Sequence, residues 1–258
     1  MTKKSFQNKI YKHFAENGRK LPWRITTDPY KILVSEIMLQ QTQVARVIPK
    51  YTAFVKAFPT ARKLAQAPIA DVLKLWQGLG YNRRALLLKK TAEFITKEYA
   101  GEFPDTYDEL LDLPGVGPYT ASAIMSFAYN KPTCMIETNI RAAYLHTFFK
   151  DKKGISDKEL MPLIEKYQDT SNPRQWYNAL MDYGAYLKET LPNPSRKSSH
   201  HIIQSRFEGS MRQVRGAIIR LYTENPKSTK RTILSELPYT REVKEAQYNK
   251  LKEEGFFK

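Results

Sequence analysis

The chain has 258 residues, enough for a substantial hydrophobic core and for one or two domains. Lysine and arginine outnumber aspartate and glutamate by 42 to 26, and the formal net charge of +16 favours a polyanionic partner such as nucleic acid or an anionic membrane surface. A single cysteine, Cys134, excludes an internal disulfide and any multi-cysteine metal or iron–sulfur site.

Membrane insertion and secretion are not expected. The first ten residues have no apolar core and no cleavage signature, and no run approaches the ~18 apolar residues of a membrane helix. We therefore expect a cytoplasmic protein that associates with the nucleoid and has no membrane partner.

The pattern of apolar residues predicts a chain of short helices and no convincing strand. A helix over residues 4–18 is followed by an extended segment, Leu21-Pro-Trp-Arg24. Asp28 and Pro29 predict the next helix start, with the acid as N-cap, and the apolar pattern continues that helix through Val44 and Ile48. Further helices are expected at about 53–57, 61–67, 70–78, 83–99, 107–112, 120–129, 140–149, 156–167 and 173–189.

The composition changes after residue 190. Residues 191–201 are basic and rich in proline and serine, and we expect them to be irregular. Helices are predicted again at 211–224, 229–237 and 240–254. These three short helices form either a small winged-helix-like module or a packing appendage.

Two carboxyl groups stand out in this pattern. Glu36 projects from a largely apolar helix surface, which favours the protonated form of a carboxyl group. The alternative is an exposed rim residue, or one paired with Arg24. Glu137 lies just before or at a helix start, with Thr138 or Asn139 as the cap, and the helix dipole alone accounts for an acid there.

Two glycine turns open helices. Leu113-Pro-Gly-Val-Gly117 predicts a tight hairpin whose outward backbone N–H groups suit a phosphate, although an ordinary loop between packed helices has the same pattern. The turn at 78–84 carries Tyr81 and Arg83, which suit a second sugar–phosphate contact; the alternative is a helix connection with solvated arginines.

Taken together, these stretches resemble the helix-hairpin-helix DNA glycosylases, and among them the MutY-type adenine glycosylases. The likeness covers about residues 5–188 in the order of the family. It is carried by Leu21-Pro-Trp-Arg24, Ser35-Glu-Ile-Met-Leu-Gln-Gln-Thr-Gln-Val44, Leu75-Trp-Gln-Gly-Leu-Gly-Tyr81, Leu113-Pro-Gly-Val-Gly-Pro-Tyr-Thr-Ala121 and, more weakly, Ala179-Leu-Met-Asp-Tyr-Gly-Ala185.

The resemblance implies an all-α fold of two lobes with DNA bound across the cleft between them. Residues 1–190 would form the glycosylase domain, with a central six-helix lobe at about 28–130 and a second lobe from the N-terminus plus about 131–190. A basic loop at 191–209 would stand in place of the iron–sulfur loop, and 210–258 would form the small helical module.

The resemblance also implies roles for particular residues. Glu36 matches the catalytic carboxyl group that protonates the adenine ring, Tyr119 matches an assisting tyrosine, and Glu137 falls where the family has a stabilising aspartate. Gln41 is a candidate for filling the gap in the base stack, and Tyr81 matches an aromatic wedge. The implied DNA- or base-binding residues are Arg24, Gln40, Gln41, Tyr81, Arg83, Leu113, Gly115, Val116, Gly117 and Thr120.

Three features depart from the family pattern. The extra methylene of Glu137 moves its carboxylate by roughly 1.5 Å relative to aspartate. The four cluster cysteines are absent, and the first of them falls at Lys188, so we expect no iron–sulfur cluster, no other metal and no cofactor. The segment after about 210 does not resemble the family's Nudix-type C-terminal domain.

The expected function is that of a monomeric base-excision-repair DNA glycosylase acting on double-stranded DNA with a mismatch or an oxidised base. It would hydrolyse the N-glycosidic bond of a flipped-out adenine opposite 8-oxoguanine or guanine. Tyr119 stands where the endonuclease III-like relatives carry a lysine, so no lyase activity is expected. The alternatives are a mismatch thymine or uracil glycosylase, and a DNA-structure-binding protein without turnover.

Overall fold

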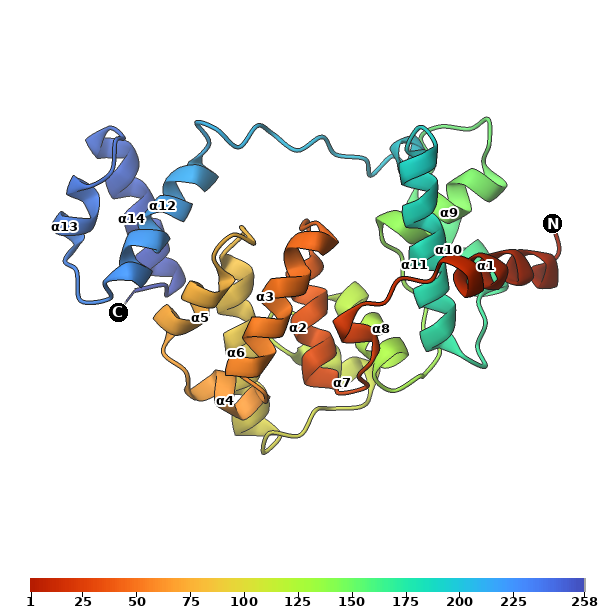
Figure 1. Cartoon of the computed structure of the whole chain (residues 1–258), viewed down its shortest axis with the longest axis horizontal. Coiled ribbons are helices and arrows are strands. Elements are labelled where there is room, and N and C mark those ends of the chain that lie inside the picture. Colours follow the sequence, from red (N-terminus) through yellow and green to blue (C-terminus); the bar gives the residue numbers. More distant parts are fainter. Residues whose placement is uncertain (258) are drawn as a thin grey trace. The chain divides into compact units, whose positions relative to one another are not determined.

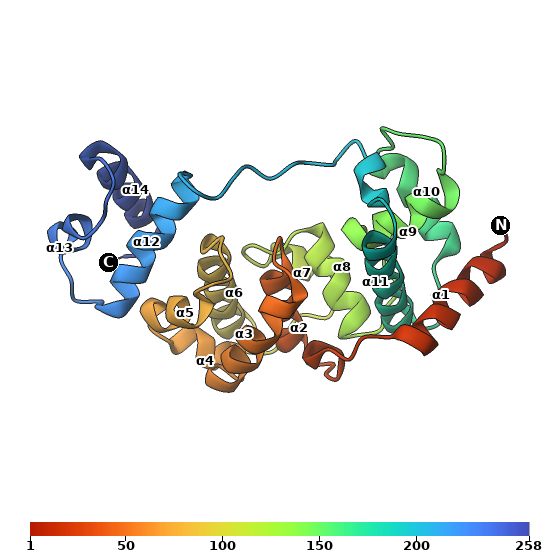
Figure 2. The ribbon, with the colours of Figure 1, turned by 45° about the horizontal axis from the view of Figure 1, so that its top comes forward.

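The computed structural model describes residues 1–257 and consists of helices joined by turns and loops, including a long irregular segment before α12 (Figures 1 and 2). No strand forms within this range, where an isolated parallel bridge joins Ile155 and Ser198. The prediction of an all-α fold is confirmed. No helix in the described part of the chain combines the length and the apolar character needed to cross a membrane.

Most helix bounds lie within two or three residues of those expected from the sequence. The elements in chain order are α1 (Lys3–Asn17), η1 (Pro22–Arg24), α2 (Pro29–Leu39), α3 (Val44–Ala57), α4 (Ala61–Gln66), α5 (Ile69–Trp76), α6 (Arg83–Glu98), α7 (Tyr107–Asp112), α8 (Pro118–Phe127), α9 (Thr138–Phe148), α10 (Asp157–Tyr167), α11 (Pro173–Thr190), η2 (Pro194–Lys197), α12 (Met211–Glu224), α13 (Lys230–Ser235) and α14 (Arg241–Glu254).

Three local expectations were wrong. The helix that begins at Asp28-Pro29 ends at Leu39, and α3 begins as a separate helix at Val44. Residues 53–57, expected to form a helix of their own, are the last residues of α3. The segment 191–201 is not wholly irregular, because Pro194–Lys197 forms a 3-10 helix. This short helix is docked in place, since the carbonyl of Lys197 accepts hydrogen bonds from the N–H groups of Gly154 and Ile155 at 2.8 and 3.2 Å.

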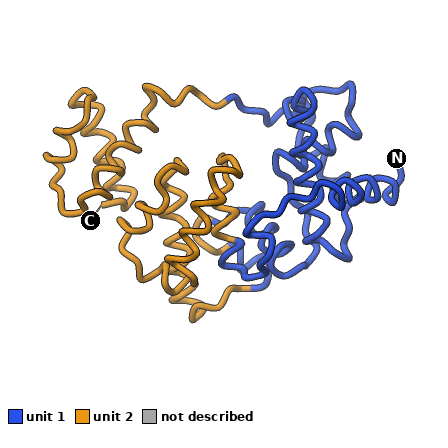
Figure 3. Tube along the Cα trace, in the orientation of Figure 1, with its two compact units in different colours: residues 1–32, 105–111, 116–203 blue, residues 33–104, 112–115, 204–258 orange. Residues whose placement is uncertain are grey.

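The chain divides into two compact units (Figure 3). Unit 1 comprises residues 1–32, 105–111 and 116–203, and unit 2 comprises 33–104, 112–115 and the described residues from 204 onwards. This division differs from the expected domains, because residues 28–32, 105–111 and 116–130 group with unit 1 and the C-terminal helices group with unit 2. Helix α8 groups with unit 1 because it packs on α11, and the C-terminal helices group with unit 2 because α12 packs on α5.

Unit 1 is organised around α11, which packs along α9 and also contacts α1 and α8 (Figure 2). Its core is rich in aromatic rings. The buried ring of Phe6 meets four others edge-on, at centroid distances of 5.3 to 5.8 Å. Such pairs add to the burial of apolar area, so the N-terminal helix is an integral part of this unit. The four partners are Tyr144, Phe148, Tyr167 and Trp176.

Unit 2 has its core where α3 and α6 meet α5 and α4 packs on α6, with Phe54 and Trp76 fully buried and their rings 6.0 Å apart. Helix α12 packs on α5, and the side-chain amide of Gln77 donates a hydrogen bond of 2.6 Å to the hydroxyl of Thr223. The C-terminal helices are therefore anchored to this unit by a polar contact as well as by packing.

The C-terminal module, α12 to α14, has a small core of its own. Val214, Ile218, Leu251 and Phe256 are buried in it. Residues 210–257 contain three helices and no strand, so the described module lacks the β-wing of a winged helix.

Candidate functional site

Glu36 lies on α2, and the sequence around it explains both the helix and the burial. Asp28 caps the helix, because its carboxylate accepts a hydrogen bond of 2.9 Å from the N–H of Tyr30. The middle of α2 is buried on all sides, and the side chain of Glu36 is only 6% exposed. The flanking residues Val34 and Ile37 are buried too.

Arg84 determines where α2 ends. Its guanidinium donates to the carbonyls of Ile37, Met38 and Gln40, at 2.7, 2.9 and 2.5 Å. These are carbonyls at the end of the helix, which have no partner within it. Gln41 follows with a φ of 54°, a left-handed backbone that is rare for a non-glycine residue. The arginine therefore stabilises a break that the apolar pattern conceals.

The same arginine holds the turn that carries Tyr81. Its other terminal nitrogen donates to the carbonyls of Leu79 and Gly80, at 3.1 and 3.0 Å. Burial lowers the pKa of Arg84 to about 10, while the neighbouring Tyr81 acts in the opposite direction. Sequence analysis expected solvated or phosphate-binding arginines in this turn; Arg84 is buried, and Arg83 is exposed.

Tyr81 and Gln41 have a common feature. Both have a left-handed backbone, with φ values of 47° and 54°, and both are exposed. Strained conformations of this kind persist only when the surrounding structure holds them, and they cluster at functional sites. Arg84 supplies that support for both segments, because it binds the carbonyls next to each of them.

The hairpin between α7 and α8 has the predicted form. Gly115 has a φ of 80°, and a Cβ there would lie 2.9 Å from the side chain of Leu87, so the position requires glycine. The carbonyl of Pro114 accepts a hydrogen bond of 2.5 Å from Thr91. Gly117 is the N-cap of α8. Three predicted contact residues, Leu113, Val116 and Thr120, have buried side chains. A phosphate at this helix start would therefore contact their backbone N–H groups rather than their side chains.

Tyr119 lies in the first turn of α8 and is half-buried. It belongs to unit 1, as do Glu137 and Arg24, whereas Glu36, Gln40, Gln41, Tyr81 and Arg83 belong to unit 2. The predicted site residues thus belong to both units of the chain.

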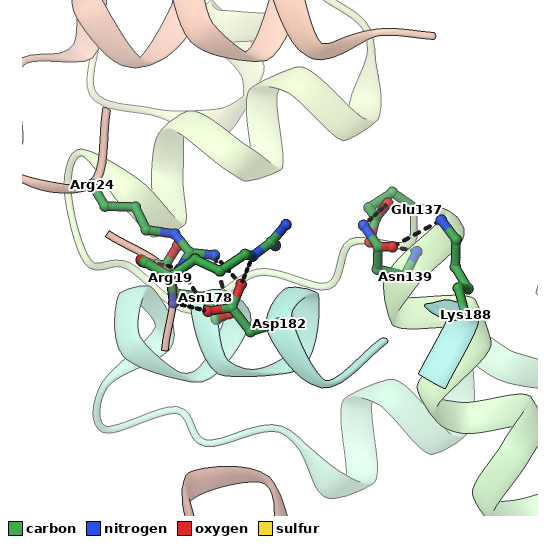
Figure 4. A network of polar contacts seen from close by, with 7 residues as sticks. All are labelled: Arg19, Arg24, Glu137, Asn139, Asn178, Asp182 and Lys188. Atoms are coloured by element: carbon green, nitrogen blue, oxygen red, sulfur yellow. Dashed lines mark hydrogen bonds and ion pairs between the residues drawn. The ribbon is translucent and has the colours of Figure 1, made fainter. Parts of the chain in front are cut away.

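Glu137 is itself the N-cap of α9, where sequence analysis expected Thr138 or Asn139 (Figure 4). One carboxylate oxygen accepts hydrogen bonds from the backbone N–H groups of Asn139 and Ile140, at 2.7 and 2.8 Å. The other accepts one of 3.2 Å from the side-chain amide of Asn139. Glutamate can serve as the cap here because its long side chain folds back over the helix start and reaches these N–H groups.

Burial dominates the electrostatics of Glu137. It raises the pKa of the carboxyl group above its ordinary value, against the hydrogen bonds from Asn139 and Ile140 and the positive charges of Lys188 and Arg141, which lower it. These donors and cations favour the charged form, and burial opposes it.

Arg24 has a structural partner that the sequence did not indicate (Figure 4). Its guanidinium donates to both carboxylate oxygens of Asp182, at 2.8 and 2.7 Å, and Arg19 donates to the same carboxylate at 2.6 Å. Asp182 is 3% exposed. Arg24 was predicted to bind DNA or a base, whereas in the structure its guanidinium is engaged within unit 1.

No pattern in the sequence indicated the internal partners of Arg84 and Asp182, or the contacts that Arg212 and Gln204 make with Tyr81 and Gln41. Arg212 and Gln204 both donate to the phenol oxygen of Tyr81, and Gln204 also donates to the side-chain oxygen of Gln41 at 3.4 Å. Their sequence separation from these partners exceeds 120 residues, and no local pattern indicates such a contact.

The donors for an iron–sulfur cluster are not present. Such a cluster is held by four ligands, usually cysteine thiolates, and the chain has one cysteine. Cys134 is half-buried, and its sulfur accepts a hydrogen bond of 3.3 Å from Gln168. Among the described residues, no group of three or more His, Cys, Asp or Glu side chains is arranged to hold a metal ion.

Known proteins match this chain in sequence and in fold. The family of HhH-GPD superfamily base excision DNA repair proteins matches residues 34–168, just over half of the chain. The adenine DNA glycosylase of Buchnera aphidicola subsp. Baizongia pistaciae is 39% identical over 189 residues, which cover 72% of this chain and 54% of the relative. The human adenine DNA glycosylase is 34% identical over 204 residues, 74% of this chain and 37% of the relative.

Solved structures share the fold. A thermostable thymine-DNA glycosylase matches with a TM-score of 0.63 and 29% identity, over 71% of this chain and 86% of the other. Endonuclease III in a non-covalent DNA complex matches with a TM-score of 0.58 and 20% identity, over 72% and 86%. The chain spans about half the length, or less, of the adenine DNA glycosylases named above. The chain belongs to the HhH-GPD superfamily of base excision DNA repair proteins.

Proposed function

We propose that this protein is a DNA glycosylase that removes a flipped-out adenine paired with 8-oxoguanine or guanine. Relatives that are 34 to 39% identical to this chain are named adenine DNA glycosylases. The proposal extends the activity in their names to this chain. The basic composition, a net charge of +16, supports a DNA partner. The enzyme would act in the cytoplasm on nucleoid DNA, as a monomer and without a cofactor.

The observation that carries the proposal is the burial of Glu36. A general acid must hold its proton near neutral pH, and a carboxyl group does so when apolar surroundings disfavour its charged form. Glu36 is 6% exposed on a helix whose flanking side chains are buried. Phosphate binding alone would not require a buried carboxyl group at this position.

The second acid, Glu137, would stabilise the positive charge that develops on the sugar when the glycosidic bond breaks. Its carboxylate is fixed by the start of α9, so its orientation does not depend on solvent. Tyr119 would assist near the sugar. A phenol cannot form the Schiff base through which a lysine cuts the strand, so the product would be an abasic site.

A second candidate, excision of mismatched thymine or uracil, is favoured by one observation. The thermostable thymine-DNA glycosylase has the same fold at 29% identity, covering 86% of that chain. The Gln40-Gln41 pair favours the adenine activity, because it matches the adenine-specific branch of the family in sequence.

The test is single-turnover base release from duplexes carrying A:8-oxoG, A:G, T:G, U:G and undamaged pairs, with alkali to reveal abasic sites. We expect release confined to the adenine strands. Release of thymine or uracil would establish the second candidate. Tight binding without release of any base would identify a DNA-structure-binding protein.

The role of Glu36 is tested in the same assay. Glu36→Gln should slow base release by at least about 100-fold, the lower end of the contribution of general acid catalysis, while DNA affinity stays nearly constant. Glu16→Gln makes the same substitution at an exposed position of α1 and is the matched control. Turnover by Glu36→Gln at the wild-type rate would rule out the assignment.

A further inference from the structure

The side-chain amide of Asn139 bridges a carboxylate and an ammonium group (Figure 4). Its nitrogen donates to Glu137 at 3.2 Å, and its oxygen accepts a hydrogen bond of 3.0 Å from the ammonium group of Lys188. The three residues form a continuous chain of hydrogen bonds from a cation to the acid. The ammonium group of Lys188 donates to the amide oxygen of Asn139, so Lys188 reaches Glu137 through Asn139.

The packing of α11 on α9 makes this contact possible. Gly184 lies one helical turn before Lys188, on the same face of α11. A Cβ at Gly184 would overlap backbone atoms of Asn139, including its carbonyl oxygen. The helix backbone therefore approaches the start of α9 as closely as glycine permits, and that approach places Lys188 beside the Asn139 side chain.

The chain of hydrogen bonds has an electrostatic direction. A cation bound to the amide oxygen polarises the amide and strengthens the hydrogen bond that its nitrogen donates. The acceptor at the other end, the Glu137 carboxylate, is thereby stabilised in its charged form. Burial opposes that form, so the contribution of the cation matters more here than it would in water.

We propose that Lys188 is a positioning residue that acts through Asn139 to hold the Glu137 carboxylate ionised and correctly oriented. The proposal rests on the proposed function, in which Glu137 stabilises the developing charge on the sugar. It gives Lys188 a role in this chain, at the position where the resemblance to the family places the first cluster cysteine.

The charged groups that face Glu137 come from two packed helices. Lys188 is on α11 and Arg141 on α9, and the guanidinium of Arg141 is bound by Asp157 of α10 at 2.8 and 2.7 Å. Asp157 neutralises part of the Arg141 charge, so Arg141 cannot make up for the loss of Lys188. Removal of Lys188 should therefore raise the pKa of Glu137.

The principal variant is Lys188→Met, which keeps an unbranched side chain only one atom shorter and removes its charge. Base release should slow by roughly 10- to 100-fold, the range expected for a catalytic group displaced by about 1 Å. The acidic limb of the rate–pH profile should move to higher pH, since Glu137 would then take up its proton more readily. Lys188→Arg should restore the rate to within a few-fold of wild type.

Lys158→Met is the matched control, because Lys158 is an exposed lysine of α10 in the same unit. It should leave the rate and the pH profile unchanged. If Lys188→Met does not fold, Lys188→Gln keeps an N–H donor for Asn139 without the charge. A rate and profile equal to wild type in the folded variant would overturn the proposal.

A measurement without turnover separates this inference from the proposed function. In ¹³C-labelled protein, the Glu137 carboxyl signal can be titrated in the wild type and in Lys188→Met. A higher titration midpoint in the variant supports the inference even if the wild type releases no base, an outcome that would contradict only the proposed function. Equal midpoints would overturn the inference whatever the activity.

Discussion

The guanidinium of Arg212 donates a hydrogen bond of 3.0 Å to the phenol oxygen of Tyr81 and lies 5.8 Å from the centroid of its ring. Arg84 approaches the same ring at 5.7 Å. Tyr81, whose backbone is left-handed, is thus contacted by Arg84 of α6 and by Arg212 of α12. The C-terminal module therefore contacts a residue that is predicted to bind DNA.

Arg212→Ala should weaken the binding of a mismatched duplex by about tenfold, because one hydrogen bond and one cation–π contact to Tyr81 are lost, together worth about 1–2 kcal/mol. Fluorescence anisotropy with a labelled duplex measures the affinity. Arg220→Ala, which removes an exposed arginine from the same helix, is the control. Equal losses in the two variants would show that charge alone accounts for the effect.

Arg84→Ala should lower the free energy of unfolding by about 3 kcal/mol, because the carbonyls of α2 and of the Tyr81 turn lose their charged donor inside the protein. Urea denaturation measures this change. Arg83→Ala, at the exposed neighbouring position, should leave stability unchanged and reduce DNA affinity. Equal stability of the two variants would contradict the structural role assigned to Arg84.

The ion cluster at Asp182 predicts a pH dependence of stability. Burial raises the pKa of Asp182, but the hydrogen bonds and charges of Arg24 and Arg19 outweigh it, so the pKa lies below its ordinary value. The stabilisation is then present above about pH 4, the ordinary pKa of aspartate, and is lost as the pH falls through the lower folded-state value.

The variant Asp182→Asn checks this prediction. It should lower stability at pH 7 by about 3 kcal/mol, because a buried arginine loses its partner. It should also lose less stability than the wild type between pH 5 and pH 2. Thermal unfolding across this range gives both results, and parallel curves for the two proteins would exclude the assignment to Asp182.

Tyr119→Lys should confer some strand cleavage, because an amine in the first turn of α8 can attack the sugar and form a Schiff base. Borohydride trapping of a covalent protein–DNA adduct detects the intermediate. The wild type should give no adduct under the same conditions. If the variant retains base release and gives no adduct, Tyr119 does not lie at the sugar.

The segment 191–201 should contribute to DNA affinity through phosphates. Arg196 is its exposed arginine, whereas the ammonium group of Lys197 donates to the carbonyl of Lys150. Arg196→Ala should reduce the slope of log affinity against log salt by about 0.9, the value for one phosphate contact. Lys158→Ala is a control of equal charge, and an unchanged slope for Arg196→Ala would place this segment away from the DNA.

Local chemistry was sufficient to predict several features. Asp28 caps α2 as expected, and the pattern Leu113 to Gly117 forms the hairpin. These features depend on residues within one or two helical turns of each other. A cap, a glycine turn and an amphipathic face are determined by nearby atoms, so the sequence displays them directly.

Other features could not be found in this way. The apolar pattern runs across the break at Gln41, because the break depends on Arg84, more than forty residues further along the chain. Arg24 looked available for DNA because its partner, Asp182, is 158 residues away. Glu137 looked like a residue beside a cap, whereas the fold of its own side chain makes it the cap.

The sequence by itself determined the helical class, the positions of most helices and the identity of the family, because these follow from periodicity and from contiguous motifs. Only the tertiary structure decided which charged groups are engaged within the protein. Arg84, Asp182 and Lys188 each bind atoms from a distant part of the chain, and the energy of a buried charge depends on those partners rather than on its neighbours in sequence.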